Sequence, residues 1–114
     1  MSEFKTQLLD YQNFLHQIRA FFYSRKVTEV KTAALLSNPI SDVYIDSICA
    51  IVNKGIGKPK SLYLHTSPEI EMKKLLAHGS GDIYQICSVY RDNEQGNQNF
   101  NEFTMLEYYR LDFD

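Results

Sequence analysis

Two apolar segments near the C-terminus constrain the fold most strongly. Residues 82–90, DIYQICSVY, and residues 102–110, EFTMLEYYR, are rich in aromatic and β-branched side chains, as strands are. The intervening residues 91–101, RDNEQGNQNFN, are almost entirely polar. Two strands joined by a polar loop pair as an antiparallel hairpin. The sequence therefore predicts a sheet built around this hairpin.

One residue of the second strand needs a separate explanation. Side chains alternate across a strand, so Phe103, Met105, Glu107 and Tyr109 share one face. A carboxylate that leaves water needs a cation or a proton, since a buried unpaired charge is costly. Two partners are available for Glu107: Arg91 at the end of the preceding strand, or a cationic ligand. The residues alone leave both alternatives open.

The N-terminal segment predicts one long helix over residues 3–24. Its apolar residues recur at a 4-3-4-3-4 spacing, which places them on a single stripe. Ser2 is suited to cap the helix, and Glu3 suits the positive end of its dipole. The stripe can serve the core alone or a partner subunit as well. Its members are Phe4, Leu8, Tyr11, Leu15, Ile18 and Phe22.

The central segments are shorter. Residues 27–32 and 61–65 read as strands, and residues 43–52 as a strand or a short helix. Residues 66–79 predict a helix with Ser67 as N-cap, Pro68 at the first helical position and Gly79 after its end. Residues 53–60, NKGIGKPK, lack the full spacing of a phosphate-binding loop and indicate an ordinary hairpin loop.

Composition limits the class of protein. The 114 residues suffice for one domain, residues 1–114, and the 44% hydrophobic content excludes a disordered chain. A net charge of −2 does not indicate a nucleic-acid binder. The sequence has no apolar run of transmembrane length and no signal peptide, so we expect a cytoplasmic protein that does not bind membranes. Cys49 and Cys87 are expected to be structural thiols, and the three histidines form no metal-ligand pattern.

Several motifs together resemble a known family. The blocks TSPE, MKKLL, GSGDIYQIC, YR…E and EFTMLE-aromatic-YR resemble, in order and spacing, the catalytic core of class II lysyl-tRNA synthetases. The resemblance is closest to the short paralogues that attach a lysine to translation elongation factor P. FFYSRKVTEVKT resembles the first motif of the family, and VYRDNE…NEFTMLEYYR resembles the second. The resemblance implies an α/β (α+β) fold, with a mainly antiparallel sheet flanked by helices and a long N-terminal helix.

The resemblance also implies site residues. Arg91 matches the catalytic arginine that binds the ATP α-phosphate and the amino-acid carboxylate, and Phe103 the ring that stacks on adenine. Glu69 matches the residue facing the substrate α-amino group. Glu107 and Tyr109 match the pair that holds the side-chain ammonium of L-lysine or a lysine analogue. Two further positions, Asn93 and Glu94, lie where the family places a group near adenine.

The sequence departs from the family pattern in three places. Residues 99–101 read Asn-Phe-Asn where the family has His-Asn-Pro, and Thr32 is followed by Ala33 rather than by proline. The third motif and the acidic residues that bind Mg²⁺ in the family find no match, so no metal ligands are assigned and the sheet is expected to be incomplete. The last strand would then present an unpaired edge.

These observations lead to two main hypotheses. The first is the lysine- and ATP-binding part of a ligase that makes a lysyl-adenylate and transfers its lysyl group to elongation factor P or tRNA. tRNA is the less favoured acceptor, since no anticodon-binding domain precedes the match. The alternative is a catalytically inactive truncated paralogue that binds lysine or acts as a dimerisation module through the N-terminal helix and first motif. A third reading is a fragment without a function of its own.

Overall fold

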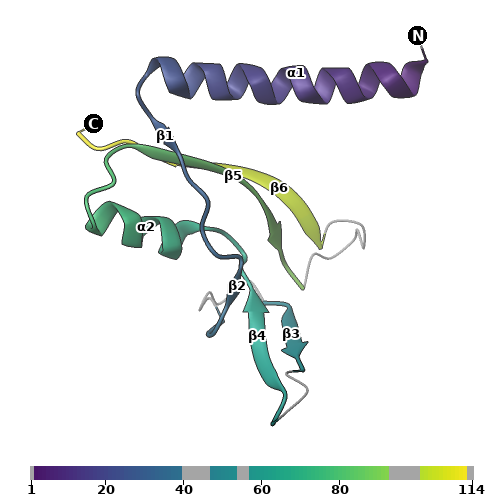
Figure 1. The fold of residues 1–114 in the computed structure, drawn as a ribbon, viewed down its shortest axis with the longest axis vertical. Helices are drawn as coiled ribbons and strands as arrows, with labels where there is room; N and C mark the ends of the chain where they lie inside the picture. The colour runs from purple at the N-terminus through teal and green to yellow at the C-terminus, as the bar shows by residue number, and fades with distance from the viewer. Residues whose placement is uncertain (1, 40–46, 54–56, 93–100, 113–114) are drawn as a thin grey trace.

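The computed structural model describes residues 2–39, 47–53, 57–92 and 101–112. Within them lie two helices and two three-stranded sheets (Figure 1). One sheet has the strand order β1-β5-β6, and the other has the order β2-β4-β3. The mixed α/β class with mostly antiparallel pairing agrees with the expected fold, but the strands form two separate sheets rather than one. Three of the four strand pairs are antiparallel, and β1 with β5 is parallel.

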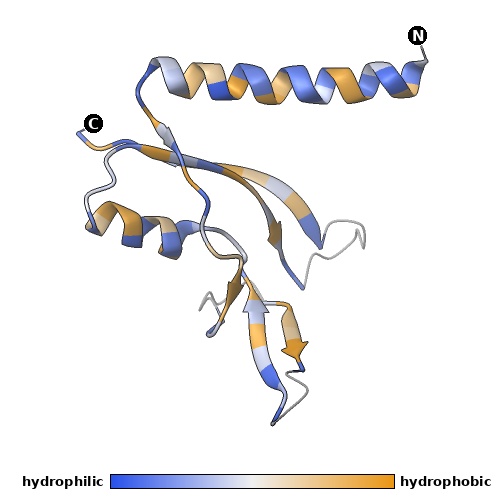
Figure 2. Ribbon diagram, viewed as in Figure 1, coloured by the Kyte–Doolittle hydropathy of each residue, from blue (hydrophilic) through white to orange (hydrophobic). Residues whose placement is uncertain are grey.

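Helix α1 spans Glu3–Ser24, as predicted. The Ser2 hydroxyl accepts a hydrogen bond from the backbone N–H of Lys5 at 3.0 Å, which confirms the predicted N-cap. Phe22, near the C-terminal end, is the buried residue of this helix. Several apolar residues nearer the N-terminus stay exposed. Figure 2 shows orange bands along the ribbon of α1, whose N-terminal part lies apart from the sheets. The stripe therefore serves the core only at its C-terminal end.

The first sheet contains the predicted hairpin. Strand β5, Ile83–Tyr90, pairs in antiparallel register with β6, Glu102–Tyr109, and the register sets Gln85 opposite Glu107. Strand β1, Thr28–Glu29, pairs in parallel with the start of β5. The strand predicted over residues 27–32 is thus shorter than expected. Pairing ends soon after the Val30 N–H donates to the Tyr84 carbonyl at 2.9 Å, because the chain then leaves toward the second sheet.

The second sheet projects away from α1 (Figure 1). Its central strand β4, Lys60–Leu64, pairs with β2, Leu35–Leu36, and with β3, Cys49–Val52, both antiparallel. The strand alternative for residues 43–52 is therefore confirmed for Cys49–Val52, while residues 43–46 lie outside the described residues. Strands β3 and β4 form the predicted hairpin, with residues 54–56 of its loop also outside the described part.

Helix α2 spans Glu69–Ala77, shorter at both ends than predicted. Pro68 occupies the N-cap position, so the prediction that Ser67 caps the helix and Pro68 starts it is wrong. The Ser67 hydroxyl still accepts a hydrogen bond from the Glu69 N–H, at 3.3 Å. Gly79 follows the helix with φ +90°, a conformation that glycine adopts without strain, as predicted.

The core forms on both faces of the first sheet. On the α1 face the rings of Phe22 and Tyr84 stack with centroids 4.2 Å apart, and Val27 packs with them. On the opposite face Met72 of α2 is fully buried, as are Ile83 and Val89 of β5. Figure 1 shows the two helices on opposite sides of this sheet. The two faces of the β5–β6 hairpin therefore have different surroundings.

A polar network connects α1 to this sheet. The Arg19 guanidinium donates through Nε and Nη2 to both carboxylate oxygens of Glu29, at 3.1 to 3.3 Å. The Tyr84 hydroxyl donates to the same carboxylate at 3.2 Å. Glu29 on β1 thus joins α1 to β5, and the C-terminal end of the helix is held in a defined position over the sheet.

Candidate functional site

The predicted site residues of β6 lie on the face of the sheet that is turned away from α1. Phe103, Met105, Glu107 and Tyr109 are half-buried, whereas the residues between them are exposed. This alternation confirms the predicted assignment of β6 residues to two faces. Cross-strand neighbours share a face, so Gln85 and Cys87 of β5 lie on the same side as Glu107.

Glu107 and Tyr109 are in direct contact. The Tyr109 hydroxyl donates a 2.7 Å hydrogen bond to Oε2 of Glu107. The part of the chain that the structure describes brings no Lys or Arg side chain to ion-pair distance from Glu107. Of the two alternatives left open by the sequence, the internal pair with Arg91 is not formed. A half-buried carboxylate with a phenol as its neighbour is suited to receive a cation from outside.

The surroundings of this pair raise the pKa of two neighbouring groups. Burial raises the pKa of the Tyr109 phenol, and its hydrogen bond to Glu107 and the nearby charges of Glu107 and Glu69 raise it further. Burial, with a smaller contribution from the Glu107 charge, raises the pKa of the Cys87 thiol to about 11. Both groups therefore stay protonated near neutral pH.

Glu69 approaches the same region from the first turn of α2. Its carboxylate forms an ion pair with Lys73 at 2.6 Å, an i,i+4 pair in which both side chains are more than half exposed. This pair was not predicted from the sequence. Exposed pairs of this kind contribute little free energy, so a ligand cation can compete with Lys73 for Glu69.

Arg91 and Phe103 meet at the other end of the hairpin. The Arg91 guanidinium carbon lies 5.0 Å from the centroid of the Phe103 ring, a cation–π arrangement. Its Nε and Nη2 also donate weakly to the Thr66 carbonyl, both at 3.4 Å. The structure thus brings together a guanidinium fork and an aromatic ring, which suit a phosphate and a purine respectively. Asn93 and Glu94 lie outside the described residues.

The residues that the resemblance assigns to the amino acid and to the nucleotide are linked along the chain and along β6. Thr66, which accepts from Arg91, lies three residues before Glu69, and β6 carries Phe103 and Glu107 on the same face. Across the described ranges, no group of three His, Cys, Asp or Glu side chains is arranged to hold a metal ion.

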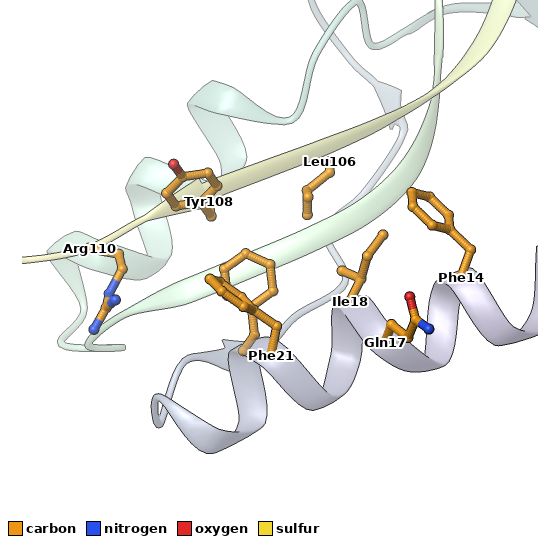
Figure 3. Close-up of a pocket in the computed structure, with 8 residues that line it drawn as sticks. Phe14, Gln17, Ile18, Phe21, Leu106, Tyr108 and Arg110 are labelled. Atoms are coloured by element: carbon orange, nitrogen blue, oxygen red, sulfur yellow. The ribbon is translucent and has the colours of Figure 1, made fainter.

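A hydrophobic cavity on the opposite face was not predicted as a pocket. It has a volume of about 690 Å³ and lies between α1 and β6 (Figure 3). Figure 3 shows aromatic and aliphatic side chains of α1 facing those of β6 across it. The signal was present in the sequence, since Phe14 and Phe21 widen the helix stripe and Leu106 and Tyr108 share the outer face of β6. Its lining comprises Phe14, Gln17, Ile18, Phe21, Phe22, Leu106, Tyr108 and Arg110.

Comparisons with known proteins agree with the arrangement of these motifs. A family model described as tRNA synthetases class II (D, K and N) matches residues 2–113. The chain is similar to the elongation factor P–(R)-β-lysine ligase of Pseudoalteromonas translucida, with 46% identity over 101 residues, covering 88% of this chain and 31% of the relative. The proteins of the same name from Vibrio atlanticus and Vibrio cholerae are 45% and 44% identical, covering 95% and 96% of this chain and 34% of each relative. The chain spans about a third of the length of these relatives.

Proposed function

Since the chain belongs to the class II tRNA synthetases of the D, K and N group, we propose that it forms the lysine- and ATP-binding part of a ligase that activates lysine or a lysine analogue. The observation that carries this proposal is the half-buried Glu107 carboxylate, which accepts a hydrogen bond from Tyr109 and has no cation at ion-pair distance among the described residues. The names of the similar ligases support a β-lysine-like substrate and elongation factor P as the acceptor.

Each site residue has a role in this proposal. The side-chain ammonium of the substrate binds Glu107 and Tyr109, and its other amino group binds Glu69 in place of Lys73. The Arg91 fork then binds the substrate carboxylate and the α-phosphate of ATP, since a guanidinium can contact two oxyanions at once. Phe103 stacks on adenine. Asn93 and Glu94, outside the described residues, are proposed to contribute to the adenine site.

The reaction follows from this placement. A carboxylate oxygen of lysine attacks the α-phosphorus of ATP, pyrophosphate leaves, and a mixed anhydride with AMP forms. Arg91 stabilises the negative charge that develops on the phosphoryl oxygens, because it is a fixed cation at that position. An amine of elongation factor P then attacks the activated carbonyl carbon, and AMP leaves with the bonding electron pair. tRNA is the second acceptor considered, and the names of the similar ligases favour the protein acceptor.

A second candidate function is supported by the exposed stripe on α1. Phe4, Leu8 and Tyr11 of the stripe are 69%, 51% and 59% exposed, and Phe14 beside it is 61% exposed, although such spacing is that of a buried helix face. Under this alternative the chain is inactive in ligation and serves as a lysine-binding or dimerisation module. In both candidates we propose that α1 and the first motif form a homodimer interface.

Titration calorimetry with lysine and with ATP separates the two candidates. Binding of both ligands, together with lysine-dependent exchange of pyrophosphate into ATP, is the result expected for the activating ligase. Binding of lysine alone favours the inactive module. A chain that binds neither lysine nor β-lysine contradicts the ligase and the lysine-binding module, and leaves only the dimerisation module. Ornithine, one methylene shorter than lysine, is the matched control for the depth of the ammonium site.

A further inference from the structure

The side-chain amide of Gln85 is hydrogen-bonded to Thr32, a residue distant in the sequence. It is 2% exposed, and its Oε1 accepts a hydrogen bond from the Thr32 backbone N–H at 3.1 Å. Its Nε2 donates to the Thr32 hydroxyl oxygen at 2.9 Å. Both polar ends of the buried amide are therefore engaged by Thr32, in the segment that leads from β1 to the second sheet.

Gln85 also lies directly opposite Glu107 in the β5–β6 register. Directly opposed residues of an antiparallel pair share a face, with Cβ atoms about 5 Å apart. A glutamine side chain is long enough to span that separation. Yet among the described residues the hydrogen bond that Glu107 accepts comes from Tyr109, at Oε2.

We propose that Thr32 is a positioning residue for substrate binding: by holding the Gln85 amide, it keeps that amide off Glu107 and leaves the carboxylate available to the substrate ammonium. This inference rests on the proposed lysine-binding function and adds a residue that the family resemblance did not assign. It also gives a role to the first motif in the site, 53 residues away from Gln85 in the sequence.

The physical basis is a competition for one carboxylate. An N–H that donates to an ionised carboxylate makes a stronger hydrogen bond than one that donates to a hydroxyl. A buried amide that loses its hydroxyl acceptor must find another, because an unsatisfied buried donor is unfavourable. Glu107 is the facing acceptor, so Gln85 released from Thr32 would satisfy the carboxylate before the ligand arrives.

The test uses Thr32→Val, which keeps the shape and the backbone N–H but removes the hydroxyl. We expect lysine affinity, measured by calorimetry, to fall about tenfold as the Gln85 amide turns to Glu107. Thr32→Ser keeps a hydroxyl and should bind lysine within about twofold of wild type.

The double variant Thr32→Val/Gln85→Met separates competition from simple structural damage. Methionine has nearly the shape of glutamine without a donor, so lysine affinity should return to within about threefold of wild type. Thermal stability should not recover, since the double variant lacks both hydrogen bonds between residues 32 and 85. A purely structural role for Thr32 predicts instead that the double variant binds no better than Thr32→Val, and this result would overturn the inference.

Lysine binding by the wild type and by Thr32→Val distinguishes failure of the proposed function from failure of the inference about Thr32. Wild-type chain that binds no lysine contradicts the proposed function itself, whereas wild-type binding with an unchanged Thr32→Val variant contradicts only the role of Thr32. If Thr32→Val fails to fold, the single variant Gln85→Met decides. Lysine affinity equal to wild type is expected, and a tenfold loss would show that Gln85 contacts the ligand and overturn the inference.

Discussion

The Tyr109 hydroxyl donates to the Glu107 carboxylate over 2.7 Å, between residues two apart on one face of β6. The phenol fixes the orientation of the carboxylate, and its raised pKa keeps it a donor well above neutral pH. We propose that the pair receives a cation supplied by a ligand, because the described residues place no Lys or Arg at ion-pair distance from Glu107.

Replacement of Glu107 by glutamine tests this arrangement most directly. The substitution keeps the shape of the side chain and removes its charge, so the ammonium loses a charge-assisted hydrogen bond. We expect lysine affinity in calorimetry to fall at least tenfold, or about 1.4 kcal/mol. Glu102→Gln is the matched control, since it makes the same change on the exposed face of the same strand. Equal affinities of the wild type and Glu107→Gln would contradict the assignment of the ammonium site.

Replacement of Phe103 by leucine should separate the nucleotide from the amino acid. The ring lies next to the Arg91 guanidinium and is the surface on which adenine is proposed to stack. Loss of stacking weakens nucleotide binding by roughly 1–3 kcal/mol, as for bases stacked on aromatic side chains. ATP affinity measured by fluorescence competition should fall accordingly, while lysine affinity should change little. Thr104→Ala, on the opposite face, is the control, and a matching loss of lysine affinity would argue against separate subsites.

A charge placed in the α1 stripe tests the proposed homodimer. Leu8 is 51% exposed and lies in the middle of the exposed part of the stripe. We expect Leu8→Glu to convert dimer to monomer, because a carboxylate buried at an apolar interface without a partner is costly. Light scattering after gel filtration measures the mass. Asn13→Glu, on the polar side of the helix, should leave the dimer intact, and a wild-type chain that is monomeric at high concentration would contradict the interface.

The raised pKa of the Cys87 thiol predicts that its alkylation is slow near neutral pH and increases steeply at alkaline pH. Its pKa is raised from 9.0 to about 11, mainly by burial, so the reactive thiolate is scarce at pH 8. Iodoacetamide should modify exposed Cys49 first, and the Cys87 rate should rise about a hundredfold between pH 8 and pH 10. Mass spectrometry of the two peptides measures both rates. A Cys87 rate that levels off near pH 9 would show that the thiol is not shielded.

The raised pKa of the Cys87 thiol also makes the stability of the fold depend on pH. The folded state favours the protonated thiol, so the contribution of Cys87 is fully present below pH 9.0 and is lost as the pH rises through about 11. Urea unfolding of wild type and Cys87→Ser at pH 8 and pH 10.5 should therefore show a larger alkaline loss of stability in the wild type.

Local sequence patterns predicted the regular elements well. The 4-3-4-3-4 spacing and Ser2 gave α1 its observed bounds, and the alternation in β6 gave the two faces of the hairpin. These features depend on residues close in the sequence. The wrong prediction for the start of α2 also concerns neighbouring residues. Ser67 and Pro68 both suit the start of a helix, and the structure places Pro68 rather than Ser67 at the N-cap.

The features that the sequence did not reveal depend on distant residues. Nothing in the periodicity of residues 27–32 indicates that strand pairing stops after Val30, because that depends on where the chain meets the second sheet. The contact of Thr32 with Gln85 joins side chains 53 positions apart, and neither residue type is unusual in its own segment. Glu107 was proposed as a site residue through the family resemblance. The structure added that its internal partner is Tyr109 rather than Arg91.

The parallel pairing of β1 with β5 has a consequence for how the chain folds. Its contact between Glu29 and Tyr84 closes a loop of 55 residues, whereas β5 and β6 meet across a short connection. Closure of the longer loop has the larger entropic cost, so we expect the hairpin to assemble first and the long helix to dock afterwards. Kinetic φ-values near zero for Tyr84→Phe, with higher values for Leu106→Ala, would establish that order, and the reverse pattern would contradict it.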